Sequence, residues 1–266
     1  MPSNQGSALA LATAVVFLAG ACGAGGPDAG DGAVGGAAGE AIGGSITVFA
    51  AASLTASFTD LAARFEEAHP DAEVALNFAG SSDLAIQIIE GAPADVLATA
   101  DAENMGKVRD AGMLTGDPVD FATNTLQLAV PPDNPAGITS LPDAAAPGVK
   151  TVVCAGQVPC GAAAAAVEQA AGVDLEPVSE ESSVADVLGK VTSGEADAGL
   201  VYRTDVRAAA GTVRGIDVPE AAGVVNTYPI AALPDSADAA TAEAFVDFVT
   251  GTEGQAVLRA AGFGAP

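Results

Sequence analysis

Apolar and polar positions follow two periods that alternate along most of this chain. Strand-like apolar runs occupy residues 46–50, 74–78 and 95–100, and each is followed by a segment in which apolar residues recur every three or four positions. The stripe behind the first run consists of Leu54, Phe58, Leu61 and Phe65. The pattern predicts three successive βα units in this part of the chain.

The second half of the chain continues this alternation. Further strands are expected at 126–130, 149–154, 198–202 and 228–233, and helices at 161–171, 183–193 and 240–250. The run LQLAVPP ends in a proline-marked turn, as expected where a chain leaves one lobe for another. We therefore predict an α/β protein with mostly parallel sheets, in two lobes joined by two crossings, with the helix at 240–250 closing the chain.

The first 45 residues have a different pattern. Residues 8–21 are apolar but too few to span a bilayer comfortably, and they end in small residues before Cys22. The sequence AGAC resembles the lipobox of bacterial lipoproteins, which predicts a signal peptide at 1–21 and lipidation of Cys22. An ordinary cleaved signal is the alternative. Residues 22–45 are rich in Gly and Ala and predict a flexible tether.

The charge balance limits the partners. The 266 residues include 9 Lys and Arg against 34 Asp and Glu, a formal net charge of -25. Such a chain is repelled by nucleic acid and by an anionic membrane surface, so we expect membrane contact only through the lipid anchor. If it binds an anion, local dipoles must outweigh a repulsive overall field.

Two cysteines, Cys154 and Cys160, flank a turn that contains Gly and Pro. Export favours a disulfide between them, because disulfides persist outside the cytoplasm. A metal site is an alternative, but it would need further ligands, and a redox pair would usually have the spacing Cys-x-x-Cys. His69 is the single histidine of the chain, which leaves a Ser-His-Asp hydrolase without its usual motif.

Four predicted strand-to-helix junctions carry residues typical of helix starts. Ser53 and Ser81 each follow a strand at the predicted N-cap of the next helix, VPCG precedes the helix expected near Gly161, and Ser183 precedes Asp186 at the spacing of a capping box. Each helix N-terminus presents unpaired N–H groups and a partial positive charge, so several that converge can hold an anion without Lys or Arg. Any one serine taken alone is more often a simple helix cap.

Four segments together resemble one family. ITVFAAASLT, FAGSSDLAIQIIEGAPADVLATAD, QVPCG and GLVY are similar, in order and spacing, to motifs of the periplasmic molybdate-binding proteins of ABC importers, the ModA family. The resemblance covers residues 46–266. It implies a type II periplasmic-binding-protein fold with the ligand in the cleft between two lobes. We assign residues 46–127 and 229–266 to the first lobe and 128–228 to the second.

The resemblance also implies a ligand set and a role. The implied donors are the hydroxyl and amide groups of Ser53 and Ser81, the main-chain N–H groups of Cys160 and Val184, and the phenol of Tyr202. The expected ligand is molybdate, and tungstate also, so molybdenum enters only as a bound oxyanion. We expect a monomer without catalysis or a cofactor, which delivers its ligand to an ABC permease.

Two alternatives to this function stay open. The first is a binder of another oxyanion such as sulfate or thiosulfate, since the size of the cavity cannot be deduced from the sequence. The second is a secreted thiol oxidoreductase that uses the cysteine pair. A set of donors alone suits a fully deprotonated oxyanion, whereas monohydrogen phosphate would leave a buried proton unpaired.

Overall fold

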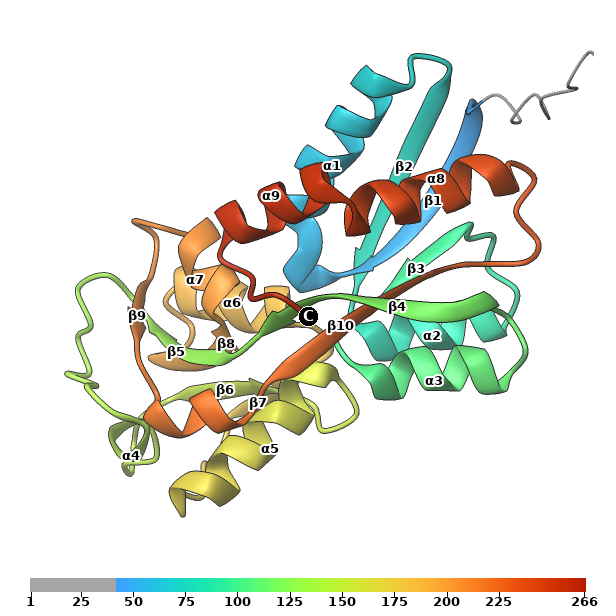
Figure 1. The fold of residues 1–266 in the computed structure, drawn as a ribbon. Coiled ribbons are helices and arrows are strands. Elements are labelled where there is room, and N and C mark those ends of the chain that lie inside the picture. Colours follow the sequence, from blue (N-terminus) through green and yellow to red (C-terminus); the bar gives the residue numbers. More distant parts are fainter. Residues whose placement is uncertain (1–41) are drawn as a thin grey trace, which may run out of the picture. The chain divides into compact units, whose positions relative to one another are not determined.

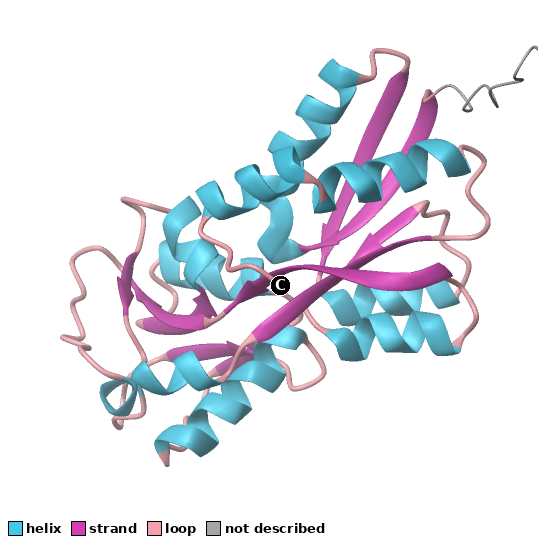
Figure 2. Cartoon of the chain, in the orientation of Figure 1, coloured by secondary structure: helices cyan, strands magenta, loops and turns pink. Residues whose placement is uncertain are grey.

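The computed structural model describes residues 42–266 (Figures 1 and 2). The predicted signal peptide, the lipidation site at Cys22 and most of the predicted tether lie outside the described residues. Within the described part, strands form two five-stranded sheets, in the spatial orders β2-β1-β3-β10-β4 and β7-β6-β8-β5-β9. The chain passes from the first sheet to the second after β4 and returns with β10, which confirms the predicted two-lobed α/β fold.

The bounds of the elements are as follows. The first sheet contains β1 (Gly44–Ala51), β2 (Ala72–Ala79), β3 (Val96–Ala98), β4 (Thr115–Asn124) and β10 (Asn226–Ala232). The second contains β5 (Leu126–Val130), β6 (Thr151–Cys154), β7 (Ser179–Glu181), β8 (Ala198–Tyr202) and β9 (Arg214–Ile216). The helices are α1 (Thr55–Ala68), α2 (Ser81–Ile89), α3 (Ala102–Asp110), α4 (Leu141–Ala144), α5 (Pro159–Ala171), α6 (Val184–Thr192), α7 (Arg203–Ala208), α8 (Ala239–Thr250) and α9 (Thr252–Ala261), with the short 3₁₀ helices η1 (Ala52–Leu54) and η2 (Pro219–Gly223).

Both sheets are mixed, so the prediction of mostly parallel sheets is wrong. In the first sheet β1 is parallel to β2 and β3, whereas β10 is antiparallel to β3 and β4. In the second, β6 is parallel to β7 and β8, whereas β5 is antiparallel to β8 and β9. The antiparallel pairs all involve β10 or β5, strands that begin after a crossing between lobes. Apolar periodicity reports the burial of a strand and not the direction of its partner.

The strands also correct the predicted boundaries. Leu126 and Gln127 were assigned to the first lobe, yet β5 pairs them with β8 in the second sheet. Residues 226–228 were assigned to the second lobe, yet they pair with β4 in the first. An apolar run does not show which sheet it will join, because its hydrogen-bond partners lie far away in the chain. The lobe exchange therefore occurs two or three residues earlier than predicted in each crossing.

The predicted tether extends too far. Gly44 and Ser45 already belong to β1, where the N–H of Gly44 donates to the carbonyl of Asp71 at 2.8 Å. The N–H of Ser45 donates to the carboxylate of Asp238 at 3.0 Å. A Gly/Ala-rich segment without periodicity carries no mark of where strand pairing begins.

The C-terminal end also differs from the prediction. Helix α8 does not close the chain, because α9 follows directly after Gly251. Beyond α9, Gly264 exchanges two main-chain hydrogen bonds with Thr123 of β4, at 3.0 and 2.9 Å. Residues 252–261 contain few large apolar side chains, so the apolar periodicity did not predict this helix.

The two lobes have different cores. In the first, α1, α8 and α9 cover one face of the sheet and α2 and α3 cover the other (Figure 1). All phenylalanines of the described residues belong to this lobe, and the rings of Phe58, Phe65 and Phe245 pack edge to face at centroid distances of 5.3 to 6.2 Å. The core of the second lobe consists mainly of Ala, Val and Leu. No helix within residues 42–266 combines the length and apolar character needed to cross a membrane.

Candidate functional site

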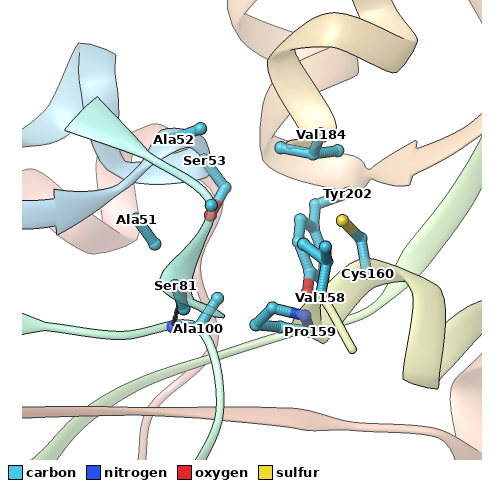
Figure 3. A pocket seen from close by; sticks show the side chains of 11 residues that line it. Ala51, Ala52, Ser53, Ser81, Ala100, Val158, Pro159, Cys160, Val184 and Tyr202 are labelled. Carbon is cyan, nitrogen blue, oxygen red and sulfur yellow. Dashed lines mark hydrogen bonds between the residues drawn. The ribbon is translucent and has the colours of Figure 1, made fainter. Parts of the chain in front are cut away.

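A small pocket lies between the two lobes. The first lobe contributes η1, the start of α2 and Ala100, and the second contributes the starts of α5 and α6 and the end of β8 (Figure 3). Its lining residues are Ala51, Ala52, Ser53, Gly80, Ser81, Ala100, Val158, Pro159, Cys160, Val184 and Tyr202. None of these side chains is charged. Its cavity volume of about 10 Å³ is far below the range of about 300–1,000 Å³ usual for organic ligands of drug size, and therefore suits only a small ion.

All five residues that the sequence predicted as ligands line this one pocket. They are Ser53, Ser81, Cys160, Val184 and Tyr202, and they come from five elements spread over 150 positions of the chain. Figure 3 shows Ser53 and Ser81 on one side, facing Val184, Cys160 and Tyr202 on the other. The structure brings the set together; that these groups bind a ligand stays a prediction.

Ser53 lies inside η1 and not at the N-cap of α1, so its predicted position is wrong. The N-cap of α1 is Leu54, which offers no side-chain hydrogen bond. The hydroxyl of Ser53 instead lies 3.0 Å from that of Tyr228. A serine shortly before a helical stripe looks the same in sequence whether it caps the helix or sits in a preceding 3₁₀ turn.

Ser81 is the first residue of α2, one position beyond the N-cap, which is Gly80. Its Oγ accepts a hydrogen bond from the main-chain N–H of Ala100 at 3.0 Å. An N–H group can only donate, so the hydrogen of the Ser81 hydroxyl stays free to donate to another acceptor. The neighbouring Ser82 is also buried, and its Oγ has no hydrogen-bond partner among the described residues.

Helix α5 begins at Pro159, two residues before the predicted start. Cys160 is its second residue, so its main-chain N–H belongs to the first turn, where no partner exists within the helix. The predicted disulfide between Cys154 and Cys160 is present and joins the end of β6 to this turn. Gly161 makes the tight turn possible, because a Cβ there would lie 2.0 Å from the carbonyl oxygen of Ala155.

Neither alternative for the cysteines finds support in this geometry. Cys154 and Cys160 are bonded to each other and almost fully buried, at 3% and 2% exposure. Within residues 42–266, His, Cys, Asp and Glu side chains form no group of three or more that could hold a metal ion. The sulfur atoms therefore connect a strand to a helix.

Val184 is the first residue of α6, and the residue before it caps the helix as predicted. The hydroxyl of Ser183 accepts a hydrogen bond from the N–H of Asp186 at 3.2 Å and donates to its carboxylate at 2.7 Å. This cap fixes the first turn of α6, so that the N–H of Val184 is directed along the helix axis.

Tyr202 ends β8 and is 1% exposed. Its hydroxyl has no hydrogen-bond partner among the described residues, although it reaches into the pocket. Burial raises the pKa of this phenol well above its ordinary value, and Tyr228, Asp205 and Asp101 raise it further. The group therefore stays protonated and can donate.

Burial raises the pKa of two carboxyl groups that lie next to residues of the pocket. Burial raises the pKa of Asp205 to about 7, against the opposing effect of the hydrogen bond from the N–H of Tyr202 at 2.9 Å. Burial also raises the pKa of Asp101, despite hydrogen bonds from Asn104. Protonation of Asp205 would reduce the repulsion that an anion meets.

Sequence reasoning missed two residues of this site. Gly80 approaches the second lobe so closely that a Cβ would lie 2.1 Å from the carbonyl oxygen of Ser182. Tyr228 lies behind Ser53 and outside the pocket lining. The only signal for Tyr228 was that it is one of two tyrosines, on a predicted strand. No local pattern marked Gly80 as a contact between lobes.

Two α/β lobes joined by two crossings, with a small pocket lined by uncharged residues between them, are typical of a two-lobed solute-binding protein. Residues 46–264 match the family described as bacterial extracellular solute-binding protein. The chain is 46% identical to the molybdate-binding protein ModA of Mycobacterium tuberculosis over 222 residues, 84% of this chain and 85% of its relative. It therefore belongs to the ModA family of bacterial solute-binding proteins.

Two further comparisons agree with this assignment. The molybdate-binding protein ModA of Escherichia coli is 32% identical over 233 residues, 83% of this chain and 89% of that protein. The solved structure of the periplasmic molybdate-binding protein of Azotobacter vinelandii matches with a TM-score of 0.73 at 23% identity, covering 83% of this chain and 99% of that one. The latter shows the shared type II fold. The relatives are binding proteins and not enzymes, which confirms the prediction of no catalysis.

Proposed function

We propose that this protein is an extracytoplasmic solute-binding lipoprotein that captures molybdate, and also tungstate, and delivers it to an ABC importer. The supporting observation is a pocket lined by all five residues of the predicted donor set and by no charged side chain. The molybdate-binding relatives support the choice of ligand. Lipidation of Cys22 would hold the protein, as a monomer, at the outer face of the cell membrane.

The chemistry of the donors supports a fully deprotonated oxyanion. Such an anion accepts hydrogen bonds and donates none, so a pocket of donors satisfies each of its oxygens. The oxygen of Ser81 is already occupied by the N–H of Ala100, and the phenol of Tyr202 keeps its proton. Monohydrogen phosphate would also need an acceptor for its own proton, at a cost of about 1–3 kcal/mol when none is available.

The pocket explains how an acidic protein could hold an anion. Cys160 and Val184 lie in the first turns of α5 and α6, where helix dipoles contribute partial positive charge. These dipoles act at short range, whereas the net charge of -25 is spread over the surface and screened by salt. Binding is therefore expected to depend only weakly on ionic strength.

Titration calorimetry on the purified protein tests the proposal. We expect heat and saturation with molybdate and with tungstate, and much weaker binding of monohydrogen phosphate. Sulfate is also fully deprotonated, so its competition against molybdate decides between molybdate and the alternative oxyanions. A protein that binds neither molybdate nor tungstate would refute the proposed function.

The anchor is tested separately. Expression of the full chain should place the protein in the membrane fraction, with a lipid-modified N-terminus at Cys22 by mass spectrometry. A Cys22→Ala variant should be released or remain unprocessed, with unchanged molybdate binding. Unmodified wild-type protein in the soluble fraction would contradict the lipoprotein assignment.

A further inference from the structure

We propose that Tyr228, held by Asn124, fixes the hydroxyl of Ser53 as a hydrogen-bond donor toward the pocket and thereby excludes protonated oxyanions. Neither Tyr228 nor Asn124 lines the pocket, so both act through Ser53 as positioning residues. The inference rests on the proposed function, because it explains how the pocket would select a deprotonated ligand.

A continuous line of hydrogen bonds leads from the pocket into the second lobe. The hydroxyl oxygens of Ser53 and Tyr228 are 3.0 Å apart. The amide nitrogen of Asn124, at the end of β4, lies 3.4 Å from the Tyr228 oxygen and 2.8 Å from the Thr204 hydroxyl of α7. All four residues are buried. The line thus connects η1, β10, β4 and α7.

The direction of these hydrogen bonds follows from Asn124. Its side-chain carbonyl oxygen accepts a hydrogen bond from the N–H of Thr125 at 3.0 Å, which orients the amide. The NH₂ group therefore points to Tyr228 and Thr204, and it can only donate. The Tyr228 oxygen accepts from it. Either hydroxyl of the Ser53–Tyr228 pair could donate to the other. Because Tyr228 already accepts from Asn124, we assign its single hydrogen to Ser53. The hydrogen of Ser53 is then left to donate into the pocket.

The surroundings of Tyr228 keep this arrangement in place. Its ring packs edge to face against Phe121, Tyr202 and Phe263, with centroid distances of 6.2, 5.9 and 5.5 Å. The side chain is fully buried, and burial raises the pKa of its phenol above the ordinary value. The ring of Tyr228 therefore keeps its position, and its hydroxyl keeps its proton at physiological pH.

Ser81 provides an internal comparison. Its oxygen is occupied by a main-chain donor, the N–H of Ala100, which no side-chain substitution can remove. The oxygen of Ser53 is occupied by a side chain, so its role can be changed by mutation. In Tyr228→Phe the Ser53 oxygen becomes free to accept. A protonated oxyanion could then donate its proton there.

The test measures the dissociation constants of molybdate and of monohydrogen phosphate at pH 8 by calorimetry and by competition. The proteins are the wild type, Tyr228→Phe, Ser53→Ala and the double variant. In Tyr228→Phe we expect the preference for molybdate over phosphate to fall roughly tenfold or more. In the Ser53→Ala background the same substitution should change this preference by less than about twofold, because Tyr228 acts through Ser53.

Two further variants separate positioning from packing. Phe263→Leu loosens the contact with the Tyr228 ring and leaves its hydroxyl unchanged. It should lower the melting temperature without altering the preference. Asn124→Asp replaces the donor to Tyr228 by an acceptor, and should weaken the preference as Tyr228→Phe does. This variant tests the same point if Tyr228→Phe proves unstable.

Each outcome has a definite meaning. If the wild type binds molybdate but Tyr228→Phe and Asn124→Asp keep its preference within about twofold, the inference is wrong while the proposed function stands. An equal effect of Tyr228→Phe with and without Ser53 also overturns it, since the action would not pass through that hydroxyl. If the wild type binds no molybdate, the proposed function fails and this inference falls with it.

Discussion

The two walls of the pocket differ in the kind of donor that we propose for each. On the first-lobe wall the proposed donors are the hydroxyls of Ser53 and Ser81. The Ser53 oxygen lies next to the Tyr228 hydroxyl, and the Ser81 oxygen accepts from the N–H of Ala100. On the second-lobe wall two of the donors are main-chain N–H groups, those of Cys160 and Val184 at helix starts. A side-chain substitution can remove a donor from the first wall, but on the second it must first disturb the backbone.

The two walls are also supported in different ways. Behind the first lies a core with edge-to-face phenylalanine rings, including Phe58 and Phe245. The second lobe has a core of smaller side chains, and its wall is fixed by the Cys154–Cys160 disulfide and by the Ser183 cap. In the second lobe, a disulfide and a helix cap therefore fix the backbone of the first turns of α5 and α6, where the first lobe has aromatic packing.

The largest effect is expected from the pH dependence of stability that Asp205 of α7, behind the second wall, causes. The pKa of Asp205 is raised to about 7 in the folded protein, so its contribution to stability is complete below the unfolded pKa of about 3.9 and is lost as the pH rises to 7. Asp205→Asn removes this loss and can still accept from the N–H of Tyr202. Urea unfolding from pH 4 to 8 should show the variant gaining roughly 4 kcal/mol relative to the wild type. A constant difference across this range would contradict the prediction.

The next effect concerns the contact between the walls. Gly80→Ala would place a Cβ 2.1 Å from the carbonyl oxygen of Ser182 and so prevent the lobes from approaching. The backbone at Gly80, with φ -61 and ψ 140, accepts any residue, so the fold should persist. We expect calorimetry to show that the affinity for molybdate is reduced roughly 100-fold. The reason is that the closed state, in which Gly80 of the first lobe meets Ser182 of the second, becomes rarely populated. Gly189→Ala, where no atom lies within 4 Å of the added Cβ, is the matched control and should bind normally.

Removal of the disulfide tests whether the second wall depends on it for stability or for binding. The variant Cys154→Ala with Cys160→Ala should lower the free energy of unfolding by about 2 kcal/mol, measured by denaturant titration. Its molybdate affinity should change less than about threefold, since the donor at Cys160 belongs to the main chain. A loss of affinity as large as that of Ser53→Ala would show that the disulfide is also needed for ligand binding.

The smallest effect is expected from a single hydroxyl of the first wall. Ser53→Ala removes one donor and should weaken molybdate binding about tenfold by calorimetry. It should also lower the melting temperature, because the buried Tyr228 hydroxyl loses its partner. The control is Thr59→Ala, which removes an exposed hydroxyl from α1. Unchanged affinity in Ser53→Ala would show that the first wall, like the second, relies on main-chain donors.

Much of the fold was predictable because buried positions recur in the sequence with the period of the helix or strand. The stripe formed by Leu54, Phe58 and Leu61 predicted α1, and the spacing of Ser183 and Asp186 predicted the cap of α6. Strand direction, the exchange of β5 and β10 between sheets, and helix α9 were missed. These depend on partners far away in the chain or on packing of weakly apolar segments.

The sequence by itself determined the family, the export-like N-terminal pattern, the cysteine pair and five of the residues that line the pocket. Only the tertiary structure decided that Ser53 lies in a 3₁₀ turn against Tyr228, that Gly80 meets Ser182, and that burial shifts the pKa of Asp205. The physical reason is that residue type and spacing encode local conformation. The direction of a hydrogen bond, the approach of two lobes and the cost of a buried charge depend on which distant groups are brought into contact.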